Sequence, residues 1–188
     1  MEEKRSTWVV RFMGVTFILG GIAWLIITLL VLGNVLAGLE PPNYALGPAS
    51  SRIVAGGGAG MWFVMGILSY LIVGIAGLGL SALFFQHLEA SLGAPLSGWR
   101  NAAAWIHLLL GGIGAAAASL LMTYGGYQAG IAALDPKYGG GGQTGLWIHT
   151  NVLGPLVVPI AALMGVALVG YLIGGLGIVT AWWTARKA

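Results

Sequence analysis

Three histidines, His87, His107 and His149, are the side chains of this sequence best suited to bind a haem iron or a metal ion, because the chain contains no cysteine. His87 ends the second of four long apolar stretches, and His107 and His149 lie early in the third and fourth. If these stretches are antiparallel membrane helices, His87 and His107 lie at one end. His149 then lies on the order of 30 Å away at the other end, at ~1.5 Å per helical residue. All three cannot bind one ion.

His87 and His107 together predict a b-type haem site with two axial imidazoles, as in four-helix membrane cytochromes. The alternative, which we favour, is an interfacial His87 beside Glu89 and a His107 that packs or hydrogen-bonds inside the protein. His149 follows Trp147 and a glycine-rich segment, and it is a candidate metal ligand together with a partner chain. We expect the chain to need no cofactor of its own.

Other catalytic patterns are missing from the sequence. It contains no HExxH, no Ser-His-Asp order and no paired carboxylates. The four glycines at 139–142 lack the Lys-Ser or Lys-Thr pair and the preceding strand of a phosphate-binding loop, and they predict a flexible linker. No carboxylate or lysine lies in the middle of an apolar stretch, which argues against a proton pump or an ion-coupled transporter. We therefore expect no enzymatic activity from this chain alone.

The four apolar stretches must position any such site. They cover about 12–39, 61–87, 102–131 and 146–183, and each exceeds the ~20 residues that a helix needs to cross a bilayer. Apolar residues make up 58% of the chain and charged residues 7%, which excludes a water-soluble protein. The prediction is an all-α, multi-pass protein of the cell membrane. We expect an antiparallel four-helix transmembrane bundle that forms a single membrane domain over residues 1–188.

The basic residues predict the orientation. Six lie in segments on one side of the predicted membrane and two on the other, namely Lys4, Arg5, Arg11, Arg100, Arg186 and Lys187 against Arg52 and Lys137. Because positive loops stay in the cytoplasm, both termini are predicted to be cytoplasmic. The net charge of +3 then reflects topology and does not indicate nucleic acid as a partner.

Glycines at helical spacing predict close helix packing within the stretches. The candidate packing positions are Gly66, Gly74, Gly77, Gly111, Gly114, Gly170 and Gly174. The faces that they form suit contacts inside the bundle, contacts with other membrane subunits, or both. Pro155 and Pro159 predict a kink in the fourth helix, or a helix that begins only at about Pro155.

The third stretch resembles a late transmembrane helix of haem-copper oxidase subunit I. The resemblance rests on His107-Leu-Leu-Leu-Gly-Gly-Ile-Gly114, on Met122 and on Gly126, and the Trp147-Ile-His149 start of the fourth stretch is similar to the helix that follows. The adjacent His-His pair and the His-Pro-Glu-Val-Tyr helix of that subunit are absent. The chain therefore cannot be the catalytic subunit.

Together with the glycine faces, the resemblance implies a non-catalytic integral membrane subunit of a larger membrane redox complex. A terminal-oxidase-type respiratory complex is the most concrete host, where the chain would act in assembly and stability. Its expected partners are lipid and other integral membrane subunits in a hetero-oligomer. Two alternatives stay open: a small b-type cytochrome that carries electrons through His87 and His107, and an accessory subunit of a membrane copper monooxygenase.

Overall fold

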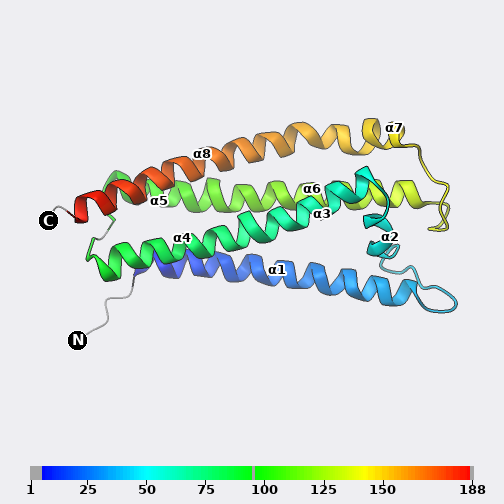
Figure 1. The fold of residues 1–188 in the computed structure, drawn as a ribbon, viewed down its shortest axis with the longest axis horizontal. Helices are drawn as coiled ribbons and strands as arrows, with labels where there is room; N and C mark the ends of the chain where they lie inside the picture. Colours follow the sequence, from blue (N-terminus) through cyan, green and yellow to red (C-terminus); the bar gives the residue numbers. More distant parts are fainter. Residues whose placement is uncertain (1–5, 95, 187–188) are drawn as a thin grey trace. The chain divides into compact units, whose positions relative to one another are not determined.

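The computed structural model describes residues 6–94 and 96–186, and this part of the chain is almost entirely helical, with no strand. Its α-helices are drawn in Figure 1. Four helical segments are long and apolar enough to cross a membrane: Thr7–Ala37, Gly58–Ser91, Trp99–Leu134 and Gly145–Ala185. The prediction of an all-helical protein with four such segments is confirmed. Lys4, Arg5 and Lys187, which entered the orientation argument, lie outside the described residues.

The first segment is one helix, and the other three each combine several elements. The first is α1 (Thr7–Ala37), and the short α2 (Ser50–Val54) follows it. The second contains α3 (Gly58–Ser69), η1 (Tyr70–Ala76), α4 (Gly77–Gln86) and η2 (His87–Ser91). The third contains α5 (Trp99–Ile106), η3 (His107–Ile113) and α6 (Gly114–Leu134), and the fourth contains α7 (Gly145–Ile148), η4 (His149–Leu153) and α8 (Gly154–Ala185).

The η elements are π-helical, with hydrogen bonds that reach five residues back in place of four. The amide of Leu92, for example, donates to the carbonyl of His87 at 3.0 Å. Each of the three histidines is the first residue of such a segment, at the start of η2, η3 and η4. Because π-helical turns occur often at functional sites, these three positions are candidates for such a site.

The two prolines of the fourth segment lie just after η4 and inside α8. The segment begins at Gly145, ten residues before Pro155, so a helix that begins only at about Pro155 is not what the structure contains. The α-helical part, however, resumes at Gly154 after the π-helical turn, and Pro159 lies inside α8. Pro155 therefore lies inside a continuous helical segment, directly after a π-helical turn where the regular α-helical hydrogen bonding is already interrupted.

The described residues fall into two compact units, and each unit takes part of every long segment. Unit 1 is drawn from Met1–Gly20, Leu71–Ala117 and Leu163–Ala188, and unit 2 from Gly21–Tyr70 and Ala118–Ala162. The two units are described separately below.

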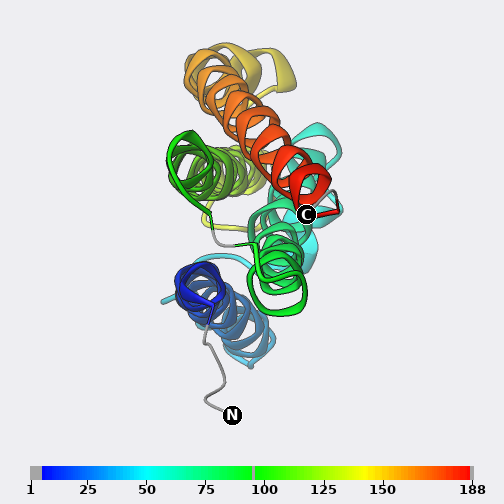
Figure 2. The same cartoon turned by 90° about the vertical axis from the view of Figure 1, so that its left-hand side faces the viewer.

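Aromatic rings fill the core of unit 1. Phe12 of α1 packs against Phe85 of α4 with ring centroids 4.8 Å apart, and Trp8 meets Trp105 of α5 edge-on at 5.2 Å. The Arg11 guanidinium lies 4.6 Å and 4.7 Å from the centroids of the Trp8 and Trp105 rings. These contacts hold the start of α1 beside α4 and α5, as Figure 2 shows. Cation–π contacts let the Arg11 charge lie among indoles with no acidic partner among residues 6–94 and 96–186.

Unit 2 combines a small-residue helix crossing with two tethered loops. A Cβ atom added to Gly126 of α6 would overlap the backbone of Phe63 in α3, so these helices are in backbone contact. The hydroxyl of Tyr127 donates to the carbonyl of Leu46 at 3.0 Å, which ties the segment after α1 to α6. Arg52 of α2 donates to the carbonyls of Tyr138 and Gly139, which joins the two loop regions of the unit.

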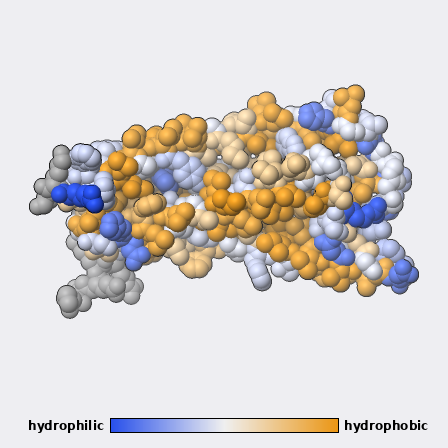
Figure 3. Space-filling view, in the orientation of Figure 1, coloured by the Kyte–Doolittle hydropathy of each residue, from blue (hydrophilic) through white to orange (hydrophobic). Residues whose placement is uncertain are grey.

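Apolar side chains cover most of the face of the helices that Figure 3 shows. In the most apolar part of the first and fourth segments only 11% of the residues are buried, against 56% in the third. The third segment is therefore largely covered by protein, whereas the first and fourth expose apolar faces that suit lipid or another membrane helix.

Candidate functional site

His107 is the most deeply placed of the three histidines, with 5% of its surface exposed. It begins η3, eight residues after the start of the third segment at Trp99, which corresponds to about 12 Å of helix at ~1.5 Å per residue. Ionisable side chains at such positions are rare in membrane-spanning helices and are a default starting point for a functional site.

Ser81 of α4 is the hydrogen-bond partner of the His107 ring. Its Oγ lies 2.8 Å from Nε2 of His107 and donates its own hydrogen to the carbonyl of Gly77, also at 2.8 Å. Because the hydroxyl has one hydrogen, Nε2 carries the imidazole hydrogen and donates to Ser81. Nδ1 is then a bare acceptor, and it has no hydrogen-bond partner within the described residues.

The backbone of α8 closes the other side of the ring. A Cβ added to Gly174 would overlap Nδ1, Cβ and Cγ of His107, so only glycine lets α8 approach here. Nδ1 therefore faces the helix backbone at contact distance, with no space for a metal ion between them in this arrangement. Leaving a buried acceptor unpaired costs about 1–3 kcal/mol, which the surrounding packing must offset.

Three aromatic rings complete the surroundings of His107. Phe12, Phe85 and Tyr171 have ring centroids 5.3, 6.3 and 5.2 Å from the imidazole centroid. The Tyr171 hydroxyl donates to the carbonyl of Val73 at 2.9 Å. Val73 lies in η1, where the π-helical turn alters the backbone hydrogen bonding, and the tyrosine supplies a donor from another helix. The cluster thus joins α1, α4, η3 and α8 of unit 1.

Chemically, this cluster is suited to fixing helices in place. The neutral imidazole donates from Nε2 to a hydroxyl that has already given its hydrogen to a carbonyl. The hydrogen bond between His107 and Ser81 therefore holds two helices together inside an apolar core. The sequence left the partner of His107 open, and it singled out neither Ser81 nor Tyr171 as a site residue.

The structure places His87 in different surroundings from His107. His87 begins η2, is exposed, and lines a groove with Trp182 of α8, whereas the His107 ring is enclosed by the residues described above. The two imidazoles are thus not brought together in this arrangement. A haem between them would require both rings to turn toward one cavity, and the haem site stays a prediction.

His149 lies in unit 2 and is also exposed. It lines a hollow of about 240 Å³ together with Gln143 and the glycines that precede α3. Among residues 6–94 and 96–186, no group of three or more His, Asp or Glu side chains lies close enough to hold a metal ion. The proposal that His149 binds a metal together with a partner chain stays a prediction.

Most of the glycines singled out for helix packing lie at helix contacts. In unit 1, Gly111 and Gly170 face each other, because a Cβ on Gly170 would overlap the backbone of Gly111. Gly114 lies against Ala167, with a built Cβ 3.6 Å from that side chain. A Cβ built on Gly77 would lie 3.5 Å from the Tyr171 hydroxyl. Gly74 is buried. In unit 2, a Cβ on Gly66 would lie 2.5 Å from the backbone nitrogen of Thr123.

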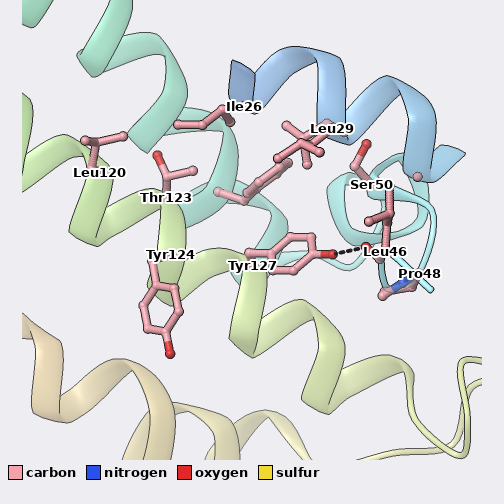
Figure 4. A pocket seen from close by; sticks show the side chains of 12 residues that line it. Ile26, Leu29, Leu46, Pro48, Ser50, Leu120, Thr123, Tyr124 and Tyr127 are labelled. Carbon is pink, nitrogen blue, oxygen red and sulfur yellow. Dashed lines mark hydrogen bonds between the residues drawn. The ribbon is translucent and has the colours of Figure 1, made fainter. Parts of the chain in front are cut away.

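A second hollow, in unit 2, has an apolar lining and a volume of about 330 Å³. Figure 4 shows Ile26 and Leu29 of α1 on one side, Thr123 and Tyr127 of α6 on another, and Leu46 and Pro48 from the intervening segment. Two of the hydroxyls in its lining bond within the protein: Thr123 donates to Ser119, and Tyr127 to Leu46. The hollow can take an apolar group and offers it little polar recognition.

Comparison with known proteins adds no further assignment to these sites. A scan of family models, a search of curated proteins and a search of solved structures found no match to this chain. The geometry of the two units and the patterns of the sequence are thus the basis for a functional proposal.

Proposed function

We propose that this chain is a non-catalytic integral membrane subunit of a larger membrane redox complex, where it acts in assembly and stability. Its helices of membrane-spanning length support a multi-pass location in the cell membrane. The proposed partners are lipid and other integral membrane subunits. In this proposal the His107 cluster stabilises the subunit, and the chemistry of the complex takes place on other chains.

The observation that carries the proposal is an open seam on α8 in unit 1. Gly165, Val169, Leu172 and Leu176 recur at spacings of four, three and four, and all four are exposed. Leu172 and Leu176 are 60% and 62% exposed. Alternating spacings of three and four define the seam of a left-handed helix pair, in soluble coiled coils and in membranes.

The opposite side of α8 supports this interpretation. Its buried seam has the same kind of spacing, at Ala167, Gly170, Gly174, Gly177 and Ala181, and it packs on η3 and α5 of the same chain. On the open seam, nothing among the described residues lies within 4 Å of a Cβ built on Gly165. A glycine costs about 1 kcal/mol in a helix relative to alanine. A partner helix seated on this seam would gain from the close approach that Gly165 allows.

The proposal that the host is a redox complex rests on the resemblance of residues 107–126 to a helix of haem-copper oxidase subunit I. We propose a terminal-oxidase-type respiratory complex as the host, and a membrane copper monooxygenase complex is the alternative. Purification at native abundance in mild detergent, followed by native gels and mass spectrometry, tests the proposal. We expect stoichiometric membrane partners that carry haem and copper, or copper alone for the alternative host. A free monomer without partners contradicts the proposal.

We further propose an antiparallel bundle with both termini in the cytoplasm, on the basis of the Lys and Arg distribution. The chain has no cysteine, and the side chains of Ser51, Ser97 and Gln143 are exposed, so single cysteines there report topology. Ser51→Cys and Gln143→Cys should react with an impermeant maleimide in intact cells, and Ser97→Cys only after lysis. Labelling of Ser97→Cys alone in intact cells would invert the orientation.

A small b-type cytochrome with His87 and His107 as axial ligands is the second candidate, and it rests on the sequence, which places both histidines at the same end of neighbouring apolar stretches. A reduced-minus-oxidised spectrum of protein produced with ample haem separates the candidates. A sharp Soret and alpha band that is lost in His107→Ala supports the cytochrome. A colourless preparation that still has its stoichiometric partners supports the non-catalytic subunit.

A further inference from the structure

A groove on unit 1 runs between the end of the second segment and α8, with a volume of about 290 Å³. Its walls are almost entirely apolar, and two of the side chains that line it, His87 and Trp182, have a polar ring nitrogen; the lining residues are Phe84, His87, Leu88, Ile178, Val179 and Trp182. An α-helix with its side chains is about 10–12 Å wide. A groove of this volume is too small for a helix and can take part of a single hydrocarbon chain.

A positive charge lies next to this groove. Arg186 directly follows Ala185, the last residue of α8, and its guanidinium carbon lies 4.1 Å from the centroid of the Trp182 ring. Arg186 is exposed, and its side chain forms no ion pair with an acidic residue in the described part of the chain. Its charge is therefore available to an anion at the mouth of the groove.

The one acidic residue of η2 does not cancel this charge. Glu89 accepts hydrogen bonds from the hydroxyl of Ser6 and from the backbone amide of Trp8, the latter at 3.3 Å. The Glu89 carboxylate is thus tied to the start of α1. His87, two residues earlier, lies on a different side of the helical turn and lines the groove.

We propose that this groove binds one acyl chain of an anionic phospholipid, whose phosphate lies against Arg186 and His87. Guanidinium and imidazole groups donate hydrogen bonds to phosphate oxygens, and indole rings are enriched in the headgroup layer. Basic pockets between transmembrane helices recognise anionic headgroups in this way. The site depends on unit 1 alone and is independent of any protein partner.

Photocrosslinking tests the site on the full-length protein in mixed detergent micelles. The probe is phosphatidylglycerol with a diazirine in one acyl chain, and mass spectrometry maps the labelled residues. We expect labels on Phe84, Ile178 and Val179, with Trp182 near the headgroup end. Unlabelled phosphatidylglycerol should compete about tenfold better than phosphatidylcholine with the same acyl chains, because both carry one phosphate and only phosphatidylcholine carries a choline ammonium that offsets its charge beside Arg186.

Two variants and two matched controls sharpen the result. Arg186→Gln should weaken competition by phosphatidylglycerol about tenfold, whereas Arg52→Gln, which removes a charge from unit 2, should not. Val179→Trp fills the groove and should abolish labelling, whereas Val166→Trp, at an exposed valine of α8 that does not line the groove, should leave it. Equal competition by both lipids, an unchanged Arg186→Gln variant, or labels spread along all helices overturns the proposal. Arg186 is exposed, so that variant remains informative if Val179→Trp fails to fold.

Discussion

Unit 1 and unit 2 both use glycine to bring helices together, but they use polar groups differently. In unit 1 the polar contacts join helices to one another inside the core, through His107 to Ser81 and Tyr171 to Val73. In unit 2 they join loops to helices, through Tyr127 to Leu46 and Arg52 to Tyr138. The comparison indicates that unit 1 depends on a fixed interior, whereas unit 2 depends on tethers that can open locally.

The largest effect is expected where glycine meets the His107 ring. Gly174→Ala places a methyl group where the imidazole already lies, so α8 must move away and the Ser81 bond is strained. Overpacking of this kind costs about 1–3 kcal/mol or more. Gly175→Ala is the matched control, because nothing in the described structure lies within 4 Å of its added Cβ.

Thermal unfolding in detergent, followed by tryptophan fluorescence, measures the difference between these two variants. We expect Gly174→Ala to melt well below the wild type and Gly175→Ala to melt at or above it, since alanine favours the helix. Equal melting temperatures would mean that α8 does not pack against His107.

The second effect concerns the buried hydroxyls. Ser81→Ala leaves Nε2 of His107 without its partner in an apolar core, and we expect a loss of about 1–3 kcal/mol. In unit 2, Thr123→Val removes only a bond to a carbonyl of the same helix, and we expect less than about 1 kcal/mol. Unfolding of the two variants under identical conditions gives the order. A larger loss for Thr123→Val would contradict the contrast between the units.

A smaller effect is expected at the tether of the Leu46 segment. Tyr127→Phe removes the bond to the Leu46 carbonyl, which contributes about 0.5–1.5 kcal/mol. Tyr124→Phe is its control, because the Tyr124 hydroxyl has no hydrogen bond within the described residues. Hydrogen exchange should accelerate at residues 44–48 in Tyr127→Phe alone, with the helices unchanged. Faster hydrogen exchange in unit 1 as well would show that the bond from Tyr127 to Leu46 stabilises more than the Leu46 segment.

The smallest effect is expected at Arg52, whose bonds to Tyr138 and Gly139 are exposed. Exposed contacts of a charged side chain contribute about 0–1 kcal/mol. Arg52→Gln should leave the melting temperature nearly unchanged and accelerate hydrogen exchange at 136–141. A drop as large as that of Ser81→Ala would mean that the loops of unit 2 carry its stability.

The four long segments could be predicted from the sequence because hydropathy over about 20 residues is a local property. Their ends extend a few residues beyond the predicted ones in most cases, as in the second segment, which ends at Ser91 where the prediction ended at about residue 87. The packing glycines could be predicted for the same reason, since spacings of three and four place side chains on one face of any regular helix.

The π-helical turns could not be predicted, and they change which residues are buried. Gly66, Gly74, Gly77 and Ser81 share one face of a regular helix, but η1 inserts an additional residue into the turn before α4. In α4 the buried residues are Leu78, Ser81, Ala82 and Phe85, whereas Gly77 is only half-buried. A shift of one residue leaves no mark in the hydropathy pattern.

The pairing of Ser81 with His107 could not be predicted from the sequence either. The two residues are 26 positions apart, and their contact depends on how two helices cross. We expected His107 to pack or hydrogen-bond inside the protein, but the sequence did not indicate which residue would be its partner. Gly174 was predicted as a packing position, but nothing in its spacing indicated that an imidazole would fill the space beside it.

The central claim, that the open seam of α8 docks a partner subunit, is tested most directly by a paired change in that seam. Leu172→Ala with Leu176→Ala removes two exposed side chains and leaves the buried seam intact. Leu80→Ala with Leu83→Ala is the control, at exposed leucines of α4 in the same unit. Native gels and mass spectrometry of both variants, expressed in the source membrane, give the partner stoichiometry. We expect the α8 variant to lose its partners while its own melting temperature holds, and the control to keep them; partners retained at full stoichiometry by the α8 variant would contradict the claim.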